Sequence, residues 1–306
     1  MKPLHVLLRS AIDYAGLFPP AGLDMRSAVD NYATYLAGEN SWALGRFVVP
    51  VDRLPEFEAA AETHYRFGVT GRPWQLAALA GSNLPTDLEA IAGFNGRHRS
   101  TSKSMVVVDT LEVKASALGV IEDTMHRIPE DLQVYVEIPV DPEPARLLDV
   151  IAGSRLRAKV RTGGVTPEAF PNSLNLIRFM RACIGANVPF KATAGLHHPL
   201  RAEYRLTYAA DSARCSMFGF LNLFLAAAFL SAGMDERNAL EVLEEKTPGA
   251  FQVERAEIRW RSNRLGLTDL LRARQDVIIS FGSCSFTEPI SELQALYLLQ
   301  PEARQA

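Results

Sequence analysis

The sequence predicts a (β/α)8 barrel, and three observations point to this fold class. Short apolar, β-branched segments recur along the chain, the first six start about 25 to 31 residues apart, and helical patterns fill the intervals. That interval is the length of a strand–helix–strand unit. Nearly continuous apolar segments are typical of parallel strands that are buried on both faces. Seven or eight such segments at even spacing favour closure into a barrel over an open doubly wound sheet.

The predicted elements follow in chain order. Strands are expected at 46–51, 73–80, 104–110, 132–140, 157–163, 188–195 and 276–283. Helices are expected between them at 86–95, 142–153 and 173–186, among other places. One further strand is needed between 195 and 276, and the segment 251–260 is the candidate for it. By this count, Lys191 lies on the sixth strand.

Length and composition fit one domain of this kind. The chain has 306 residues, 48% of them hydrophobic and 22% charged, and can therefore bury a large core. We expect a single domain over residues 1–306, with an N-terminal loop and helix at 1–40 and the barrel at 41–300. The helix at 24–38 precedes the first predicted strand and is expected to cover the bottom of the barrel.

The segment 215–234 carries no charged side chain and reaches the lower length range of a membrane-spanning helix. Asn222 in its middle, and the ordinary composition of the rest, favour a helix buried in the protein instead. We expect this helix to pack between the barrel and a subunit interface, which would make the protein a homo-oligomer. No membrane contact is expected.

Charge and cysteine content restrict the class of partner. The net charge of −3 gives the molecule no electrostatic footprint for nucleic acid or an anionic membrane. Three scattered cysteines form no disulfide framework or metal motif and fit a reducing compartment. The first apolar run is too short for a signal peptide because Arg9 interrupts it. We therefore expect a cytoplasmic protein that acts on a small metabolite.

Charged side chains at the ends of predicted strands are the candidates for an active site, because barrel enzymes place catalytic groups there. Asp109 and Glu137 are the candidate proton carriers at two such ends. Alternate residues of a strand point the same way, so Lys159 shares a face with Arg161, and Lys191 with Thr193. For any single one of these charged residues, a structural salt bridge is an equally good explanation. Several charges buried under the helix layer would be costly, which favours the barrel mouth.

A local excess of positive charge predicts an anionic substrate. The segment 159–214 contains eight lysines and arginines against three acidic residues, in an otherwise acidic protein. A small phosphorylated or carboxylated metabolite is therefore expected. The expected substrate-binding residues are Arg46, Lys159, Arg161, Gly163, Gly164, Thr193, His198, Ser283 and Ser285. The glycines among them are equally ordinary as turn residues.

The segment PFKATAGLHHP at 189–199 places Lys191 inside a buried strand. Burial and nearby cations lower the pKa of a lysine, and a neutral amine can form a Schiff base with a carbonyl group. Residues 190–195 resemble the Lys-Thr-Ser-Thr-Gly strand of deoxyribose-phosphate aldolases. In that family, as in several other class I aldolases, the Schiff-base lysine lies on the sixth barrel strand.

This resemblance implies an aldolase-like lyase in which Lys191 is the nucleophile and Asp109 a proton carrier. It covers six residues and the strand spacing, and the chain departs from the family pattern in two ways. The family has an activating lysine on the next strand, where the segment 251–260 has none, so Lys159 would have to substitute from the other side. The family also lacks the pair His197-His198.

The histidine pair leaves three interpretations open. His197 is assigned to acid–base catalysis, for which imidazole is suited. A second interpretation is ligation of a divalent metal together with Asp109 or Glu137, and a third is a structural role in the loop. If His197 acts in acid–base catalysis, no cofactor is expected. The alternative functions are therefore a metal-assisted hydrolase or enolising lyase, and a non-catalytic barrel that binds a metabolite. Cys284 has no histidine near it in sequence and is interpreted as a small turn residue.

Overall fold

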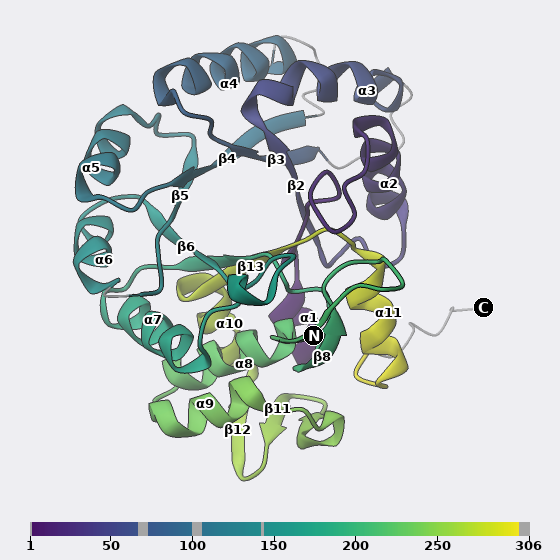
Figure 1. Ribbon diagram of the computed structural model, residues 1–306, viewed down its shortest axis with the longest axis vertical. Coiled ribbons are helices and arrows are strands. Elements are labelled where there is room, and N and C mark those ends of the chain that lie inside the picture. Colours follow the sequence, from purple (N-terminus) through teal and green to yellow (C-terminus); the bar gives the residue numbers. More distant parts are fainter. Residues whose placement is uncertain (1, 67–72, 100–105, 142–143, 300–306) are drawn as a thin grey trace.

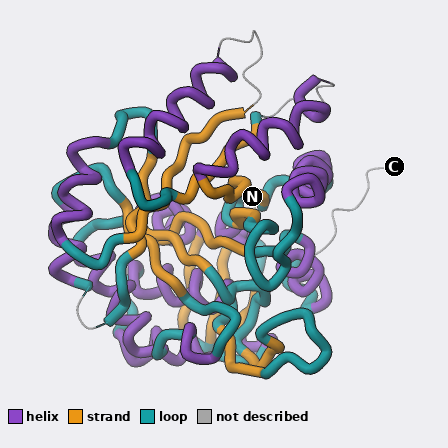
Figure 2. Tube along the Cα trace, turned by 45° about the horizontal axis from the view of Figure 1, so that its top comes forward, coloured by secondary structure: helices purple, strands orange, loops and turns teal. Residues whose placement is uncertain are grey.

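The computed structural model describes residues 2–66, 73–99, 106–141 and 144–299, and contains a closed barrel of eight strands. Around the barrel the strands lie in the order β1-β13-β7-β6-β5-β4-β3-β2, and every neighbouring pair is parallel. Figure 1 shows the strands as an inner ring surrounded by helices, and Figure 2 shows the same arrangement from a tilted view. The prediction of a (β/α)8 barrel is confirmed. The barrel strands are β1 (Ile12–Tyr14), β2 (Leu44–Pro50), β3 (Trp74–Leu79), β4 (Val106–Lys114), β5 (Gln133–Glu137), β6 (Arg157–Arg161), β7 (Phe190–Thr193) and β13 (Ile278–Ser283).

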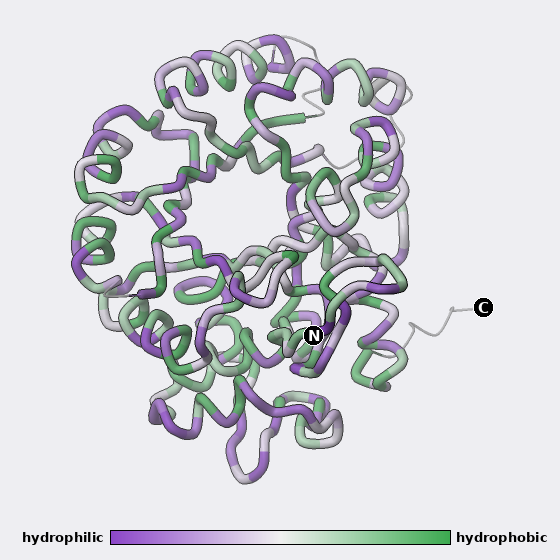
Figure 3. The backbone as a smooth tube through the Cα atoms, in the orientation of Figure 1, coloured by the Kyte–Doolittle hydropathy of each residue, from purple (hydrophilic) through white to green (hydrophobic). Residues whose placement is uncertain are grey.

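The helices after the first six strands form the outer ring. They are α2 (Met25–Ala37), α3 (Leu54–Arg66), α4 (Leu84–Arg99), α5 (Leu118–Arg127), α6 (Ala145–Ala152) and α7 (Ser173–Gly185). Figure 3 shows hydrophilic and hydrophobic residues alternating along them, as expected of helices with one face on a sheet and one in water. Parts of two predicted elements, 104–105 and 142–143, lie outside the described residues.

The first barrel strand is β1, which the sequence analysis placed in an N-terminal loop. A strand of three residues is too short to show a period of two, so only its pairing reveals it. Ile12 is in register with Phe281 of β13 on one side, and Tyr14 with Phe47 of β2 on the other. The barrel therefore begins near residue 12 and not at 41. As a consequence Lys159 lies on the sixth strand along the chain and Lys191 on the seventh.

Helix α2 belongs to the outer ring, and the expectation that it covers the bottom of the barrel is wrong. It follows β1 as every other ring helix follows its strand, and it packs against α3 and β2. Asp24 caps its N-terminus by accepting a hydrogen bond from the backbone N–H of Ser27 at 2.9 Å.

The segment 251–260 is not a barrel strand. It forms β10 (Phe251–Val253) and β11 (Glu257–Trp260), which join β12 (Asn263–Gly266) in a separate antiparallel sheet. Ile258 and Trp260 are buried whereas Glu257 and Arg259 are more exposed. This alternation is typical of an antiparallel sheet with one face in solvent, and a strand buried on both faces lacks it. The eighth barrel strand is instead the predicted segment 276–283, seen as β13.

A long connection between β7 and β13 carries the remaining elements. It holds the hairpin β8 (Ala202–Arg205) and β9 (Arg214–Met217), the small sheet, and the helices α8 (Phe220–Ser231), α9 (Glu236–Glu244) and α10 (Leu267–Asp276). Outside this connection, α1 (Pro3–Leu8) packs against α10, and α11 (Thr287–Ala295) follows β13. Short 3-10 turns within the described ranges are Val51–Arg53, Pro167–Ala169 and Pro248–Ala250.

Helix α8 is the apolar segment noted in the sequence, and its burial is confirmed. Every residue from Phe220 to Leu230 is buried, under α7, α9, α10 and β13 of the same chain. It therefore presents no apolar face to a second subunit, and the expected oligomer interface is not available on this helix. Among the described residues, no helix is long and apolar enough to cross a membrane.

Candidate functional site

A cavity of about 370 Å³ lies at the C-terminal ends of the barrel strands. It is the place where the fold class puts an active site. The residues predicted from sequence that line it are Glu137, Lys159, Arg161, Gly164, Lys191, Thr193 and His197. The loop from Ala15 to Pro20, which follows β1, forms one side of the cavity.

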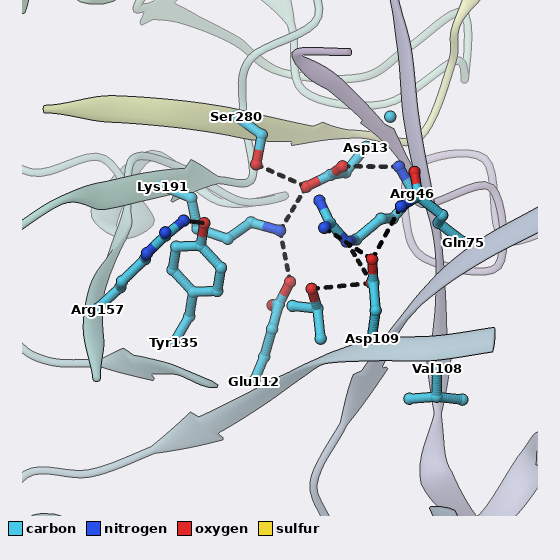
Figure 4. A network of polar contacts seen from close by, with 12 residues as sticks. Asp13, Arg46, Gln75, Val108, Asp109, Glu112, Tyr135, Arg157, Lys191 and Ser280 are labelled. Carbon is cyan, nitrogen blue, oxygen red and sulfur yellow. Dashed lines mark hydrogen bonds and ion pairs between the residues drawn. The ribbon is translucent and has the colours of Figure 1, made fainter. Parts of the chain in front are cut away.

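Glu112 joins two lysines in the floor of the cavity. Its Oε2 lies 2.6 Å from Nζ of Lys159, and its Oε1 lies 2.6 Å from Nζ of Lys191. The two lysines come from the adjacent strands β6 and β7, on which they are in register with each other. The carboxylate therefore holds both ammonium groups side by side (Figure 4 shows the Lys191 half of this contact).

The two lysines differ in their second partner and in exposure. Lys159 contacts Oε2 of Glu137 at 2.8 Å, and its side chain is 8% exposed. Lys191 contacts Oδ2 of Asp13 at 2.5 Å, and its side chain is only 2% exposed. Lys159 is thus the more accessible of the two amines.

Asp13 anchors Lys191 from the short strand β1. Its Oδ2 also accepts a hydrogen bond from Ser280 Oγ at 2.7 Å, and its Oδ1 accepts one from the backbone N–H of Arg46 at 2.8 Å (Figure 4). Gly45 leaves room for this carboxylate, because a Cβ there would lie 2.3 Å from Oδ1 of Asp13. Strand β1 therefore supplies a fully buried carboxylate as well as closing the barrel.

The opposite charges around Lys191 and Glu112 determine the protonation states of these two residues. Burial alone would lower the pKa of Lys191, but the charges of Asp13 and Glu112 and their hydrogen bonds raise it above its ordinary value. This is opposite to the lowered pKa expected from the sequence. Burial would likewise raise the pKa of Glu112, but Lys159 and Lys191 lower it to about 2. Near neutral pH, Lys191 is therefore an ammonium ion and Glu112 a carboxylate.

His197 follows β7 and lies beside the end of β13. Its Nδ1 is 3.3 Å from Oγ of Ser283 and 3.6 Å from Sγ of Cys284, and the side chain is buried. Burial lowers its pKa to about 4, with a smaller contribution from the charge of His198. His197 is therefore a neutral imidazole at pH 7, suited to exchange a proton with a ligand.

Cys284 also lines the cavity, and the fold supplies the histidine that the sequence did not place near it. Its Sγ lies 3.6 Å from the hydroxyl of Tyr208, which comes from the turn between β8 and β9 and donates a hydrogen bond to Glu288 at 3.0 Å. Burial raises the pKa of the Cys284 thiol. The thiol form is thus favoured, and the residue is a weak nucleophile.

Arg46 and Asp109 do not line the cavity. Asp109 lies near the beginning of β4, which continues to Lys114, so it does not end its strand as the sequence suggested. Arg46 Nε lies 2.6 Å from Oδ1 of Asp109, and Gln75 donates to the same carboxylate at 3.0 Å (Figure 4). These groups form an ion pair in the lower half of the barrel, where neither can clamp a substrate anion in the cavity or carry its proton.

The remaining predicted binding residues have structural contacts. His198 pairs with Glu292 at 2.7 Å and stacks on Tyr204. At Gly163 a Cβ would lie 2.5 Å from the ring of Phe170 and 3.0 Å from Cα of Gly195, so this glycine allows two loops to approach. Ser285 Oγ accepts the backbone N–H of Glu288 near the start of α11, and Ser283 supports His197.

The sequence analysis missed Asp13, Glu112 and Lys114. Strand β4 was taken to end at 110, although Leu111 and Val113 continue the apolar pattern and leave Glu112 and Lys114 on the alternate positions. That alternation is a signal that could have found both residues. For Asp13 the three-residue strand offers no comparable signal.

The residues proposed as metal ligands are not brought together. Asp109 pairs with Arg46, Glu137 with Lys159, and His197 with Ser283 and Cys284. Within the described ranges, no group of three or more histidine, cysteine or acidic side chains is arranged to hold a metal ion. The donor set of the metal-assisted alternative is therefore not assembled here.

Comparison with protein-family models, with curated proteins and with solved structures gave no match for this chain.

Proposed function

We propose that this protein is a lyase that cleaves or forms a carbon–carbon bond of a small carbonyl compound through a Schiff base on Lys159. The observation that carries the proposal is the pair of lysines on consecutive barrel strands, joined by Glu112 in the floor of the cavity. The aldolase resemblance implies a Schiff-base lysine on the sixth strand and an activating lysine on the next. With β1 counted, Lys159 lies on the sixth strand and Lys191 on the seventh, so the strand count assigns the two roles the other way round from the motif at 190–195, which contains Lys191.

The contacts favour Lys159 over Lys191 as the nucleophile. Lys191 is almost completely enclosed and has its pKa raised by two carboxylates, so its amine stays protonated. Lys159 is more exposed to the cavity and lies 2.8 Å from Glu137, which can accept its proton.

The reaction then balances on residues of this chain. The Lys159 amine forms a C–N bond with the substrate carbonyl, the oxygen leaves as water, and an iminium ion results. A base, Glu137, removes the proton from the hydroxyl of the departing fragment, which leaves as an aldehyde or ketone. The electron pair of the broken C–C bond moves to the iminium nitrogen and gives an enamine. Neutral His197, which lines the same cavity, relays the proton that the enamine carbon takes up, and water then releases the product.

Borohydride trapping tests this proposal. The wild-type protein is incubated with a panel of small oxo acids, ketones and aldehydes, reduced, and analysed by intact mass and peptide mapping. We expect a reduced adduct on Lys159, which Lys159→Met abolishes. Lys191→Met should weaken trapping at least tenfold, because Glu112 then loses its second cation and pairs with the Lys159 ammonium alone. The control Lys246→Met, a lysine outside the cavity, should trap as wild type does.

The outcomes separate clearly. An adduct that maps to Lys191 and survives in Lys159→Met would reverse the roles of the two lysines. No adduct with any compound of the panel, in a protein shown to be folded by circular dichroism, would contradict the Schiff-base mechanism.

A further inference from the structure

The cavity walls differ in chemistry around the barrel. The side formed by the loop after β1 and by the ends of β2 and β3 is apolar throughout. It consists of Ala15, Phe18, Pro19, Pro20, Val48, Leu79 and Ala80. The side formed by β4, β5, β6 and β7 carries the charged residues. A ligand that fills the cavity therefore meets an apolar wall on one side and a charged wall on the other.

The floor of the charged side does not attract an anion. Its two ammonium groups, on Lys159 and Lys191, face the three carboxylates of Asp13, Glu112 and Glu137. The cluster is therefore negative by one charge when all five groups are ionised, and a substrate anion placed beside it would be repelled.

The rim of the same side does attract an anion. Lys114 at the end of β4 and Arg161 at the end of β6 both line the cavity and are exposed. Neither has an ion pair or side-chain hydrogen bond within the described part of the chain. The strand β5 alone separates their strands, and Lys114 is in register with Glu137, which is in register with Lys159, two residues before Arg161. Two strand spacings across and two residues along place the Cα atoms of Lys114 and Arg161 about 12 Å apart, a gap that two long side chains can span around one oxyanion.

The spacing along β6 relates the anion to the reacting carbonyl. Arg161 follows Lys159 by two residues on the same face, which is about 7 Å along a strand. A carboxylate or phosphate at Arg161 therefore places a carbonyl a few bonds away against Lys159. The rest of the ligand is left facing the apolar wall.

We infer that the substrate is an amphiphilic oxo compound, with one oxyanion at the Lys114–Arg161 rim and an aliphatic or aromatic substituent against Phe18 and Leu79. A polyhydroxylated sugar does not fit, because its hydroxyl groups would lose water and find no hydrogen-bond partner on that wall. This inference deepens the proposed function, since the position of the carbonyl rests on Lys159 as nucleophile.

Binding of unreactive probes tests the inference independently of the chemistry. Propanoate, hexanoate, pentyl phosphate and gluconate are titrated calorimetrically into the wild-type protein. Burial of one methylene group is worth roughly a fourfold change in affinity. We therefore expect hexanoate or pentyl phosphate, whichever headgroup the rim accepts, to bind at least about tenfold more tightly than propanoate, and gluconate to bind more weakly than either.

Single substitutions test whether the apolar wall causes the tighter binding of longer chains. Leu79→Asn should reduce the ratio of hexanoate to propanoate affinity by at least about threefold. Arg161→Gln should weaken the anions together and leave their ratio unchanged. Leu174→Asn, a substitution of a partly exposed leucine on α7 outside the cavity, is the matched control and should bind as wild type does.

Gluconate binding as tight as hexanoate binding, or a ratio that Leu79→Asn does not change, would overturn the inference. Because the probes contain no ketone or aldehyde, their binding does not depend on imine formation. If hexanoate binds more tightly than propanoate but no borohydride adduct forms, only the proposed reaction is contradicted. If an adduct forms on Lys159 but longer chains do not bind more tightly, only the amphiphilic substrate class is contradicted.

Discussion

His197 links the candidate site to stability through its protonation. Its pKa is about 4 in the folded protein and near 6.5 in an unfolded chain, because burial disfavours the charged form. Between these pH values the unfolded state binds more protons. The free energy of unfolding therefore falls as the pH drops from about 6.5 to about 4, and the full contribution of the neutral imidazole is present only above 6.5.

A pH series of urea unfolding measures this effect. His197→Gln lacks the titrating group, so the advantage of wild type over the variant should shrink by about 3 kcal/mol between pH 7 and pH 4. The control His126→Gln, at an exposed position of α5, should run parallel to wild type over the same range. A wild-type advantage over His197→Gln that does not change with pH would contradict the buried neutral histidine.

Single residues show what the sequence could predict about the site. Lys159, Lys191, Glu137 and His197 were found because a charge or imidazole beside a buried strand stands out against apolar neighbours. The protonation state of Lys191 could not be predicted, because it depends on carboxylates from distant strands. Asp13, 178 residues away along the chain, holds Lys191 and helps to reverse the direction expected for its pKa.

At the scale of elements, α8 shows how an apolar helix is fixed inside a protein. Asn222 is completely buried in its first turn. Its Nδ2 donates to the carbonyl groups of Val242 and Glu245, each at 2.8 Å, and its Oδ1 accepts the backbone N–H of Arg201 at 2.9 Å. One side chain therefore satisfies three backbone groups at the end of α9 and before β8.

Replacing this residue tests its role. Asn222→Leu keeps the approximate size but removes the Asn222 hydrogen bonds of three backbone groups, of which the Val242 carbonyl keeps the backbone N–H of Glu245 at 3.4 Å. Each of the other two groups loses its side-chain partner at a cost of about 1 to 3 kcal/mol. We expect a loss of at least about 2 kcal/mol in the free energy of unfolding, measured by urea denaturation. Asn238→Ala, which removes an exposed hydrogen bond to Asp235, is the control and should cost less than about 1 kcal/mol. If Asn222→Leu lowers the free energy of unfolding by no more than Asn238→Ala does, α8 is held by apolar packing alone.

The elements also show where sequence patterns fail. Seven barrel strands were located because buried parallel strands of four or more residues leave a nearly continuous apolar signal. The segment 251–260 was misassigned because a short strand of the small antiparallel sheet supplies a similar apolar run, although its alternating burial separates the two cases. The pairing of β1 with β13 and β2 joins residues that are far apart in sequence, so no local sequence pattern predicts it.

At the scale of the whole molecule, the N-terminal strand closes both the barrel and the charge network. Backbone N–H groups of Phe281 and Ile12 donate to Ala11 and Ala43, at 2.8 and 3.0 Å, on the two sides of the seam. Without β1, two strand edges would be open, and Lys191 would keep only Glu112 as its partner. A buried cation that loses one of two carboxylates is strongly destabilising.

Deletion of residues 1–14 should therefore abolish the cooperative unfolding transition and lead to binding of a hydrophobic dye, as for an opened barrel. A synthetic peptide of residues 1–24 should restore near-UV circular dichroism when added to the truncated protein. The same peptide with Ile12→Pro should not, because proline lacks the N–H that Ile12 donates to Ala43. A truncated protein that unfolds cooperatively, with wild-type near-UV dichroism, would show that the barrel closes without β1 and that the boundary at residue 41 was right. The peptide experiment separates this strand from a mere N-terminal extension, because only a strand paired on both edges depends on the backbone N–H groups that the proline removes.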